Sequence, residues 1–209
     1  MQMTMKRPGR PKADDARDLR ADLLSTSRAL LEEGGPAALS LREVARRAGC
    51  THQAPYHYFK DREAILATLV AEGFDDLARR LAAANDIAAT KGARAGLLAS
   101  GRAYVEFALS HPGVFRVMFR NDLCDPQRNA AVREAGGRAW QELSRLRTLV
   151  FGADSDPALA TILWAHVHGL SSLLIDSPMA LSVGSGAGQR AMVEAAGETF
   201  ATLLLGSHT

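Results

Sequence analysis

The 209-residue chain has an ordinary globular composition, with 47% hydrophobic and 23% charged residues. It contains no repeat and no Pro-rich or Gln-rich tract, so a solenoid and a largely disordered chain are excluded. The positive charge lies in the N-terminal third, because residues 1–70 carry 12 Lys and Arg against 9 Asp and Glu, while the remaining residues carry 13 against 14. This asymmetry favours a polyanion as the partner of the N-terminal third.

Two features of the sequence concern the cell compartment. Cys50 and Cys124 have no CxxC spacing and indicate neither a disulfide framework nor a zinc ribbon, which fits a reducing cytosol. Residues 1–15 are basic without an apolar core stretch or a cleavage site, and no uncharged apolar run of about 18 residues follows. We therefore expect a soluble, unprocessed, cytoplasmic protein with no membrane partner.

The spacing of apolar residues predicts an all-α fold of about nine helices, because Ala, Leu, Arg and Glu recur at helical intervals and alternating strand patterns are nearly absent. Residues 1–13 are expected to form a flexible basic arm. A first helix is predicted at 14–33, and it is ended by Gly34, Gly35 and Pro36.

Residues 40–59 contain two short predicted helices separated by a glycine. Ser40 can cap the first helix, and Glu43 can reach back to the Ser40 amide, which makes a capping box. Gly49 supplies the left-handed residue that ends this helix, and Thr51 can cap a second one that runs to about Phe59. This arrangement is typical of a helix-turn-helix, whose second helix enters the major groove of DNA.

The surface of the second short helix suits DNA. Gln and Thr side chains can read base edges, and Tyr, His and Lys side chains can reach phosphates. Ala54, Tyr58 and Phe59 are expected to provide the inward anchoring. An ordinary exposed helix in a bundle is the alternative. The predicted DNA-binding residues are Arg42, Thr51, His52, Gln53, Ala54, Tyr56, His57 and Lys60.

The basic arm is a second candidate for DNA contact. It contains Gly9-Arg10-Pro11, a short extended motif like those that place an arginine in a narrow minor groove. A solvated tail that keeps the protein soluble is the alternative. The candidate arm residues are Lys6, Arg7, Arg10 and Lys12.

The chain beyond residue 60 is predicted to be helical. Asp61 can cap a long helix, and Asp125-Pro126 and Asp156-Pro157 each place an N-cap carboxylate before a proline at the first helical position. The predicted helices are 62–84, 96–109, 111–119, 126–151, 157–175 and 186–205, with loops expected at 85–94 and 176–188.

The segments SLREVA (40–45), AGCT (48–51) and YHYFKDREAIL (56–66) strongly resemble the N-terminal domain of the TetR family of bacterial transcriptional repressors. The resemblance covers residues 17–70 and implies a DNA-binding domain at 14–60, followed by a ligand-binding and dimerisation domain at 61–209. Pro55, Tyr58 and Arg62 stand where the family usually has an aliphatic residue, His and Lys. The DNA sequences that relatives bind are therefore not transferable to this chain.

The C-terminal part resembles a subgroup of this family through the segment ALSHPGVFRVMF (108–119) and through Trp164 followed by His168-Gly169. The resemblance implies a domain that binds an inducer and dimerises through its last two helices. Those two helices carry more apolar surface than one bundle face usually needs, which also favours a two-fold four-helix interface.

Large apolar and aromatic side chains with a few polar groups form small-molecule sites between the helices of bundles. Plain core packing is the alternative for each such residue. The candidate pocket residues are Phe115, Met118, Phe119, Trp140, Trp164 and His168.

The expected function is a homodimeric, DNA-binding transcriptional regulator, a repressor that a small apolar inducer releases from its double-stranded operator. The sequence has no GxSxG, HExxH, Walker or dinucleotide motif, so no catalytic residue, cofactor or metal ligand is predicted and the protein is not expected to be an enzyme. A metal-sensing regulator of the same fold is the alternative, with a helical hydrolase more distant. His166 and His168 could join Cys124 or His111 at a metal, but they lie about 200° apart around a helix.

Overall fold

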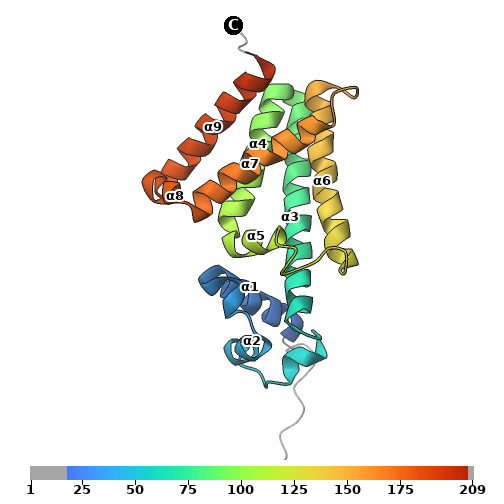
Figure 1. Ribbon diagram of the computed structural model, residues 1–209, viewed down its shortest axis with the longest axis vertical. Helices are drawn as coiled ribbons and strands as arrows, with labels where there is room; N and C mark the ends of the chain where they lie inside the picture. Colours follow the sequence, from blue (N-terminus) through green and yellow to red (C-terminus); the bar gives the residue numbers. More distant parts are fainter. Residues whose placement is uncertain (1–17, 207–209) are drawn as a thin grey trace, which may run out of the picture.

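The computed structural model describes residues 18–206, and over this range the chain forms nine α-helices and one 3-10 helix without any strand (Figure 1). The all-α prediction is confirmed. The helices of residues 19–57 lie at one end of the molecule, and α3 (Arg62–Lys91) runs from them into the larger helical part. The candidate arm residues Lys6, Arg7, Arg10 and Lys12 and the predicted start of the first helix lie outside the described residues.

Helix α1 (Leu19–Ala38) begins at Asp18, whose carboxylate accepts a hydrogen bond from the amide of Ala21 at 3.1 Å. The predicted stop at 34–36 is a kink, because Gly35 has φ of 65° and a last turn that includes Pro36 continues to Ala38. Helix α2 (Leu41–Ala48) has the predicted ends: Ser40 Oγ accepts from the Glu43 amide, and Gly49 is left-handed with φ of 68°. The Glu43 carboxylate, predicted to reach back to the Ser40 amide, instead accepts from Arg46 and Arg47.

The third predicted helix, 52–59, is the four-residue 3-10 helix η2 (Ala54–His57). Pro55 explains the difference, because it has no amide to donate and its ring clashes with a carbonyl four residues earlier in an α-helix. The Thr51 side chain makes no cap, and its backbone carbonyl accepts from Ala54 instead. The inward role predicted for Tyr58 is wrong: Tyr58 is 46% exposed, whereas Pro55 and Phe59 are buried.

The predicted loop at 85–94 is wrong, since α3 continues to Lys91 and only Gly92 separates it from α4 (Ala93–Ser110). Asn85 is polar but fully buried, and its Nδ2 donates to the carbonyl and the carboxylate of Glu142 at 2.9 and 3.0 Å. A buried polar residue with its own partners therefore interrupted the apolar period without ending the helix.

The predicted helix start at Asp156-Pro157 is confirmed, because the Asp156 carboxylate accepts from the Ala158 amide at 2.8 Å. The matching start at Asp125-Pro126 is wrong. There the Asp125 carboxylate caps a turn at Gln127, and the helix begins only at residue 130. The remaining helices are α5 (Pro112–Met118), α6 (Ala130–Phe151), α7 (Ala158–Asp176), α8 (Pro178–Val183) and α9 (Ala187–Leu205), of which α8 lies in a predicted loop.

Packing places α3 at the centre of the larger part, where it lies along α4 and α6, while α7 and α9 pack against α4 (Figure 1). Helix α1 packs against α2 and α5, so α5 joins the two parts of the molecule. Within residues 18–206, α7 is the one helix with the length and apolar content that could cross a membrane, with a mean hydropathy of 1.5.

Candidate DNA interface and ligand cavity

The polar residues of the predicted recognition segment lie on the surface of the protein. Pro55 and Phe59 turn inward, and the Arg20 guanidinium lies 5.7 Å from the centre of the Phe59 ring. This anchoring leaves the other side chains of η2 and its turn facing solvent. The exposed residues are Arg42, Thr51, His52, Gln53, Tyr56, His57 and Lys60, and Ala54 is half-buried.

The cations near this segment differ in their partners. Arg46 and Arg47 are held by Glu43 and Glu33, at 2.6 Å each. The Arg46 and Arg47 guanidinium groups lower the pKa of the Glu43 carboxyl to about 2, so this cluster stays ionised near neutral pH. Within residues 18–206, Arg42 and Lys60 make no ion pair, and their charges are available to a phosphate.

Two contacts that join the helix-turn-helix to the rest of the protein were not predicted. Arg62, the first residue of α3, donates from Nε to the Leu39 carbonyl at 3.0 Å and from Nη2 to the Pro36 carbonyl at 2.6 Å. Glu32 of α1 accepts a 2.6 Å hydrogen bond from the amide of Gly113 in α5. Both depend on residues far apart in sequence, which no local pattern reveals.

An aromatic cavity of about 490 Å³ lies between α3, α4, α5, α6 and α7. Its walls include five of the six candidate pocket residues, namely Met118, Phe119, Trp140, Trp164 and His168. Phe115 does not line the cavity but supports its wall, with its ring 5.3 Å from that of Phe119 and 5.2 Å from that of His168. Unpredicted lining residues are Phe74, Leu77, Tyr104, Asn121, Pro126, Val132, Arg133, Gly136, Ala139 and Leu143.

A hydrogen-bonded chain fixes three of these side chains. Trp164 Nε1 donates to the Tyr104 hydroxyl at 3.1 Å, and that hydroxyl lies 3.0 Å from His168 Nδ1. Because Tyr104 accepts from Trp164, its own proton is free to be donated to His168 Nδ1. Burial raises the pKa of Tyr104 and lowers the pKa of His168, so both groups are neutral near neutral pH. The proton of the imidazole then lies on Nε2.

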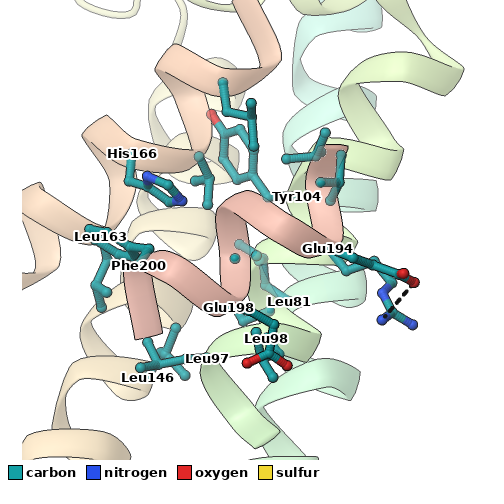
Figure 2. A pocket seen from close by; sticks show the side chains of 18 of the residues that line it. Leu81, Leu97, Leu98, Tyr104, Leu146, Leu163, His166, Glu194, Glu198 and Phe200 are labelled. Atoms are coloured by element: carbon teal, nitrogen blue, oxygen red, sulfur yellow. Dashed lines mark hydrogen bonds and ion pairs between the residues drawn. The ribbon is translucent and has the colours of Figure 1, made fainter. Parts of the chain in front are cut away.

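A second cavity, of about 370 Å³, lies between α3, α4, α6, α7 and α9 (Figure 2). Leucine is the most frequent residue in its walls, and His166 stacks on Phe200 with ring centres 3.8 Å apart. Glu194 and Glu198 lie at its edge and pair with arginines of α4. His166 and His168 thus face different cavities, and within residues 18–206 no three His, Cys, Asp or Glu side chains are grouped to hold a metal ion.

Comparison with known proteins agrees with both parts of the structure. Residues 23–69 match the family model for bacterial regulatory proteins of the tetR family, and residues 97–203 match the model for the tetracyclin repressor-like C-terminal domain. A solved structure of a protein with unknown function from Rhodococcus sp. RHA1 is 34% identical, with a TM-score of 0.74 over 91% of this chain and 97% of that one.

Two further similar proteins are named as regulators. A tetR-family regulatory protein from Rhodococcus RHA1 shares the fold, with a TM-score of 0.70 and 18% identity over 93% of this chain and all of that one. An HTH-type transcriptional regulator of Mycobacterium tuberculosis is 29% identical over 58% of this chain, and the match spans 54% of that protein, about half its length. These are families and relatives of DNA-binding regulators rather than of enzymes. The chain belongs to the TetR family of bacterial transcriptional regulators.

Proposed function

We propose that this regulator is a homodimeric repressor in the cytoplasm, which binds a two-fold operator through residues 14–60 and leaves it when a small apolar inducer occupies the aromatic cavity. The observation that supports this proposal is that two walls of the cavity are also the elements that touch the helix-turn-helix. Helix α3 carries Phe74 and Leu77 of the cavity and begins at Arg62, while α5 carries Met118 and contacts Glu32 through Gly113.

DNA recognition is proposed for the exposed face of η2 and its turn. Gln53 and Tyr56 lie on this face, Tyr56 being 56% exposed, and they are placed to reach base edges while Arg42 and Lys60 bind phosphates. Ion release from the phosphates then contributes a large part of the binding free energy. The affinity for DNA should fall steeply as the salt concentration rises.

The test is alanine replacement at Gln53 and at Tyr56. Each variant is expected to bind its operator more weakly by about 1–3 kcal/mol, because a base contact is lost. The operator is first selected from a random pool of duplexes with the parent protein, and affinities are then measured by fluorescence anisotropy. Gln141→Ala, the same change at an exposed position of α6, is the control and should leave affinity unchanged. Parent-like binding by both variants would refute this recognition face, and failure to select any sequence would refute operator binding.

Release by an inducer requires that the ligand bind the conformation that fits the operator more weakly than the conformation that does not. A ligand that moves α5 away from the axis of the cavity would shift the α1 contact made by Gly113, and a shift of α3 would act through Arg62. The coupling free energy is typically about 1–3 kcal/mol, and it is reciprocal, so operator DNA should weaken inducer binding by the same factor.

Dimerisation is proposed for α7 and α9, because each presents large apolar side chains to solvent. Ile162 is 46% exposed and Leu173 is 49% exposed on α7, and Leu203 is 77% exposed on α9. Helix α9 lies at the edge of the bundle, where a second copy can approach it (Figure 1). Two copies of this helix pair make a four-helix interface with two-fold symmetry, which matches a two-fold operator.

The double change Ile162→Glu and Leu203→Glu is expected to give a monomer, because four carboxylates would be buried without partners in the dimer. Sedimentation equilibrium at micromolar concentration measures the mass. The control is Leu149→Glu, a partly exposed leucine on α6 outside the proposed interface, which should leave the dimer intact. A monomeric parent protein, or a double variant that remains dimeric, would contradict the assignment.

A further inference from the structure

The two cavities differ in charge, although both are largely apolar. The lining of the second cavity includes the carboxylates of Glu194 and Glu198 together with Arg102. Among residues 18–206, the lining of the aromatic cavity includes one charged side chain, Arg133, and no carboxylate. A bound cation would therefore find no counter-ion in the aromatic cavity, and desolvation of its charge would oppose binding.

The interior of the aromatic cavity suits a flat, unsaturated molecule. The rings of Trp140 and Trp164 are 6.1 Å apart at 76°, and the Phe119 ring lies 5.9 Å from that of Trp164. Phe74 closes the same wall, with its ring 5.5 Å from that of Phe119. The Trp140–Trp164 and Phe74–Phe119 pairs are set edge to face, so these rings can contact both the face and the edge of an aromatic ligand.

Arg133 differs from the neighbouring arginines of α6. Arg138 pairs with Asp75 at 2.7 Å, and Arg145 pairs with Asp86 at 2.6 Å. Within residues 18–206, the one hydrogen bond of the Arg133 side chain is a long one, 3.3 Å from Nη1 to the Pro126 carbonyl, and Arg133 forms no ion pair. Its guanidinium therefore retains donors that can hold a carboxylate in a bidentate pair.

The two acidic residues of the loop that precedes α6 already have other partners. Asp122 pairs with Arg120 at 2.7 Å, and Asp125 accepts from the Gln127 amide and lies 3.6 Å from Arg128. The free guanidinium at the cavity is therefore not neutralised by this loop. A second donor comes from His168, because Nδ1 accepts from Tyr104 and leaves the Nε2 proton without a partner in the described residues.

We propose that the aromatic cavity selects a planar hydrophobic anion, of the class of aromatic carboxylates, with the rings of Phe119, Trp140 and Trp164 around its apolar part and Arg133 binding its charge. This ligand class rests on the proposed function, which makes the cavity the inducer site, and narrows the inducer from any small apolar molecule to an amphipathic anion.

The test uses three probes with the same ring system and different charge: 2-naphthoate, 2-naphthamide and 2-naphthylmethylammonium. Isothermal titration of the full-length protein near neutral pH measures their affinities. We expect naphthoate to bind about ten-fold more tightly than the ammonium probe, since the Arg133 guanidinium attracts a carboxylate and repels an ammonium group. Arg133→Gln should remove that preference and leave the affinity for the neutral amide unchanged. Arg128→Gln, an exposed arginine that does not line the cavity, is the matched control and should keep the preference.

The outcomes separate this inference from the proposed function. Equal affinity for the anion and the cation, a preference that survives Arg133→Gln, or no binding of any probe would overturn the ligand class. Naphthoate binding that depends on Arg133 would support the class whether or not it alters DNA affinity. If such binding left operator affinity unchanged, the proposed inducer release would fail while the ligand class stood.

Discussion

Replacing Gly113 with alanine is expected to destabilise the protein by about 3 kcal/mol, near the upper end of what overpacking usually costs. A Cβ at this position would lie 2.5 Å from both the carbonyl carbon and the carbonyl oxygen of Leu31 and 2.7 Å from the Glu32 nitrogen. These are backbone atoms of α1, which cannot rotate away as a side chain can. Helices α1 and α5 must therefore separate, and the 2.6 Å hydrogen bond from the Gly113 amide to Glu32 would lengthen or break.

Urea denaturation followed by circular dichroism measures this effect. Gly137→Ala is the matched control, because Gly137 lies within α6 and an added Cβ there meets no atom within 4 Å. That change should stabilise the protein by up to about 1 kcal/mol, since alanine is the better helix former. A Gly113→Ala protein with the parent's unfolding midpoint would show that the close approach of α5 to α1 does not exist in solution.

The sequence predicted elements well where a local signal decides the structure. The hydroxyl of Ser40 and the carboxylates of Asp61 and Asp156 accept from amides two or three residues later, and the left-handed backbone of Gly49 ends α2, so each has the predicted role at its helix end. The same kind of signal failed at Asp125, where the carboxylate caps a turn and the helix starts at residue 130. An N-cap residue followed by proline permits a helix or a turn, and packing of the following residues decides between them.

The candidate sites follow the same division. The exposed polar residues of η2 and its turn could be identified from the pattern, because the predicted anchor Phe59 is buried. The burial of Pro55 and the exposure of Tyr58 were not predicted. Five of the six candidate pocket residues line one cavity, yet Tyr104 and Arg133 were missed. Tyr104 contributes to the cavity by its hydrogen bonds to Trp164 and His168 of α7. Arg133 contributes a positive charge that no carboxylate within residues 18–206 pairs with. Neither property is visible along the chain.

Arg62 shows how tertiary contacts override a local preference. A cation at the first position of a helix is disfavoured by the helix dipole, and Arg62 opens α3. Its position is explained by the carbonyls of Pro36 and Leu39, which follow the kink of α1 and receive its two N–H donors. The guanidinium fork thus joins the segment before α2 to the helix that leads to the aromatic cavity.

Replacing Arg62 with methionine is expected to cost about 2–3 kcal/mol of stability, because two hydrogen bonds from a charged group are lost. The Leu39 carbonyl then loses the Arg62 donor, and the Pro36 carbonyl keeps only the Leu39 amide. Arg62→Lys should cost less, since an ammonium group can reach a carbonyl but cannot reproduce the fork. The control is Arg79→Met on the same helix, where a 75% exposed arginine in a surface pair with Asp76 should contribute little.

Denaturation midpoints give the stabilities, and hydrogen exchange of the α2 amides shows whether the loss is local. We expect exchange of these amides to accelerate in Arg62→Met and to remain at the parent rate in Arg79→Met. Equal midpoints and equal exchange in the two variants would mean that the Arg62 contacts hold nothing in place.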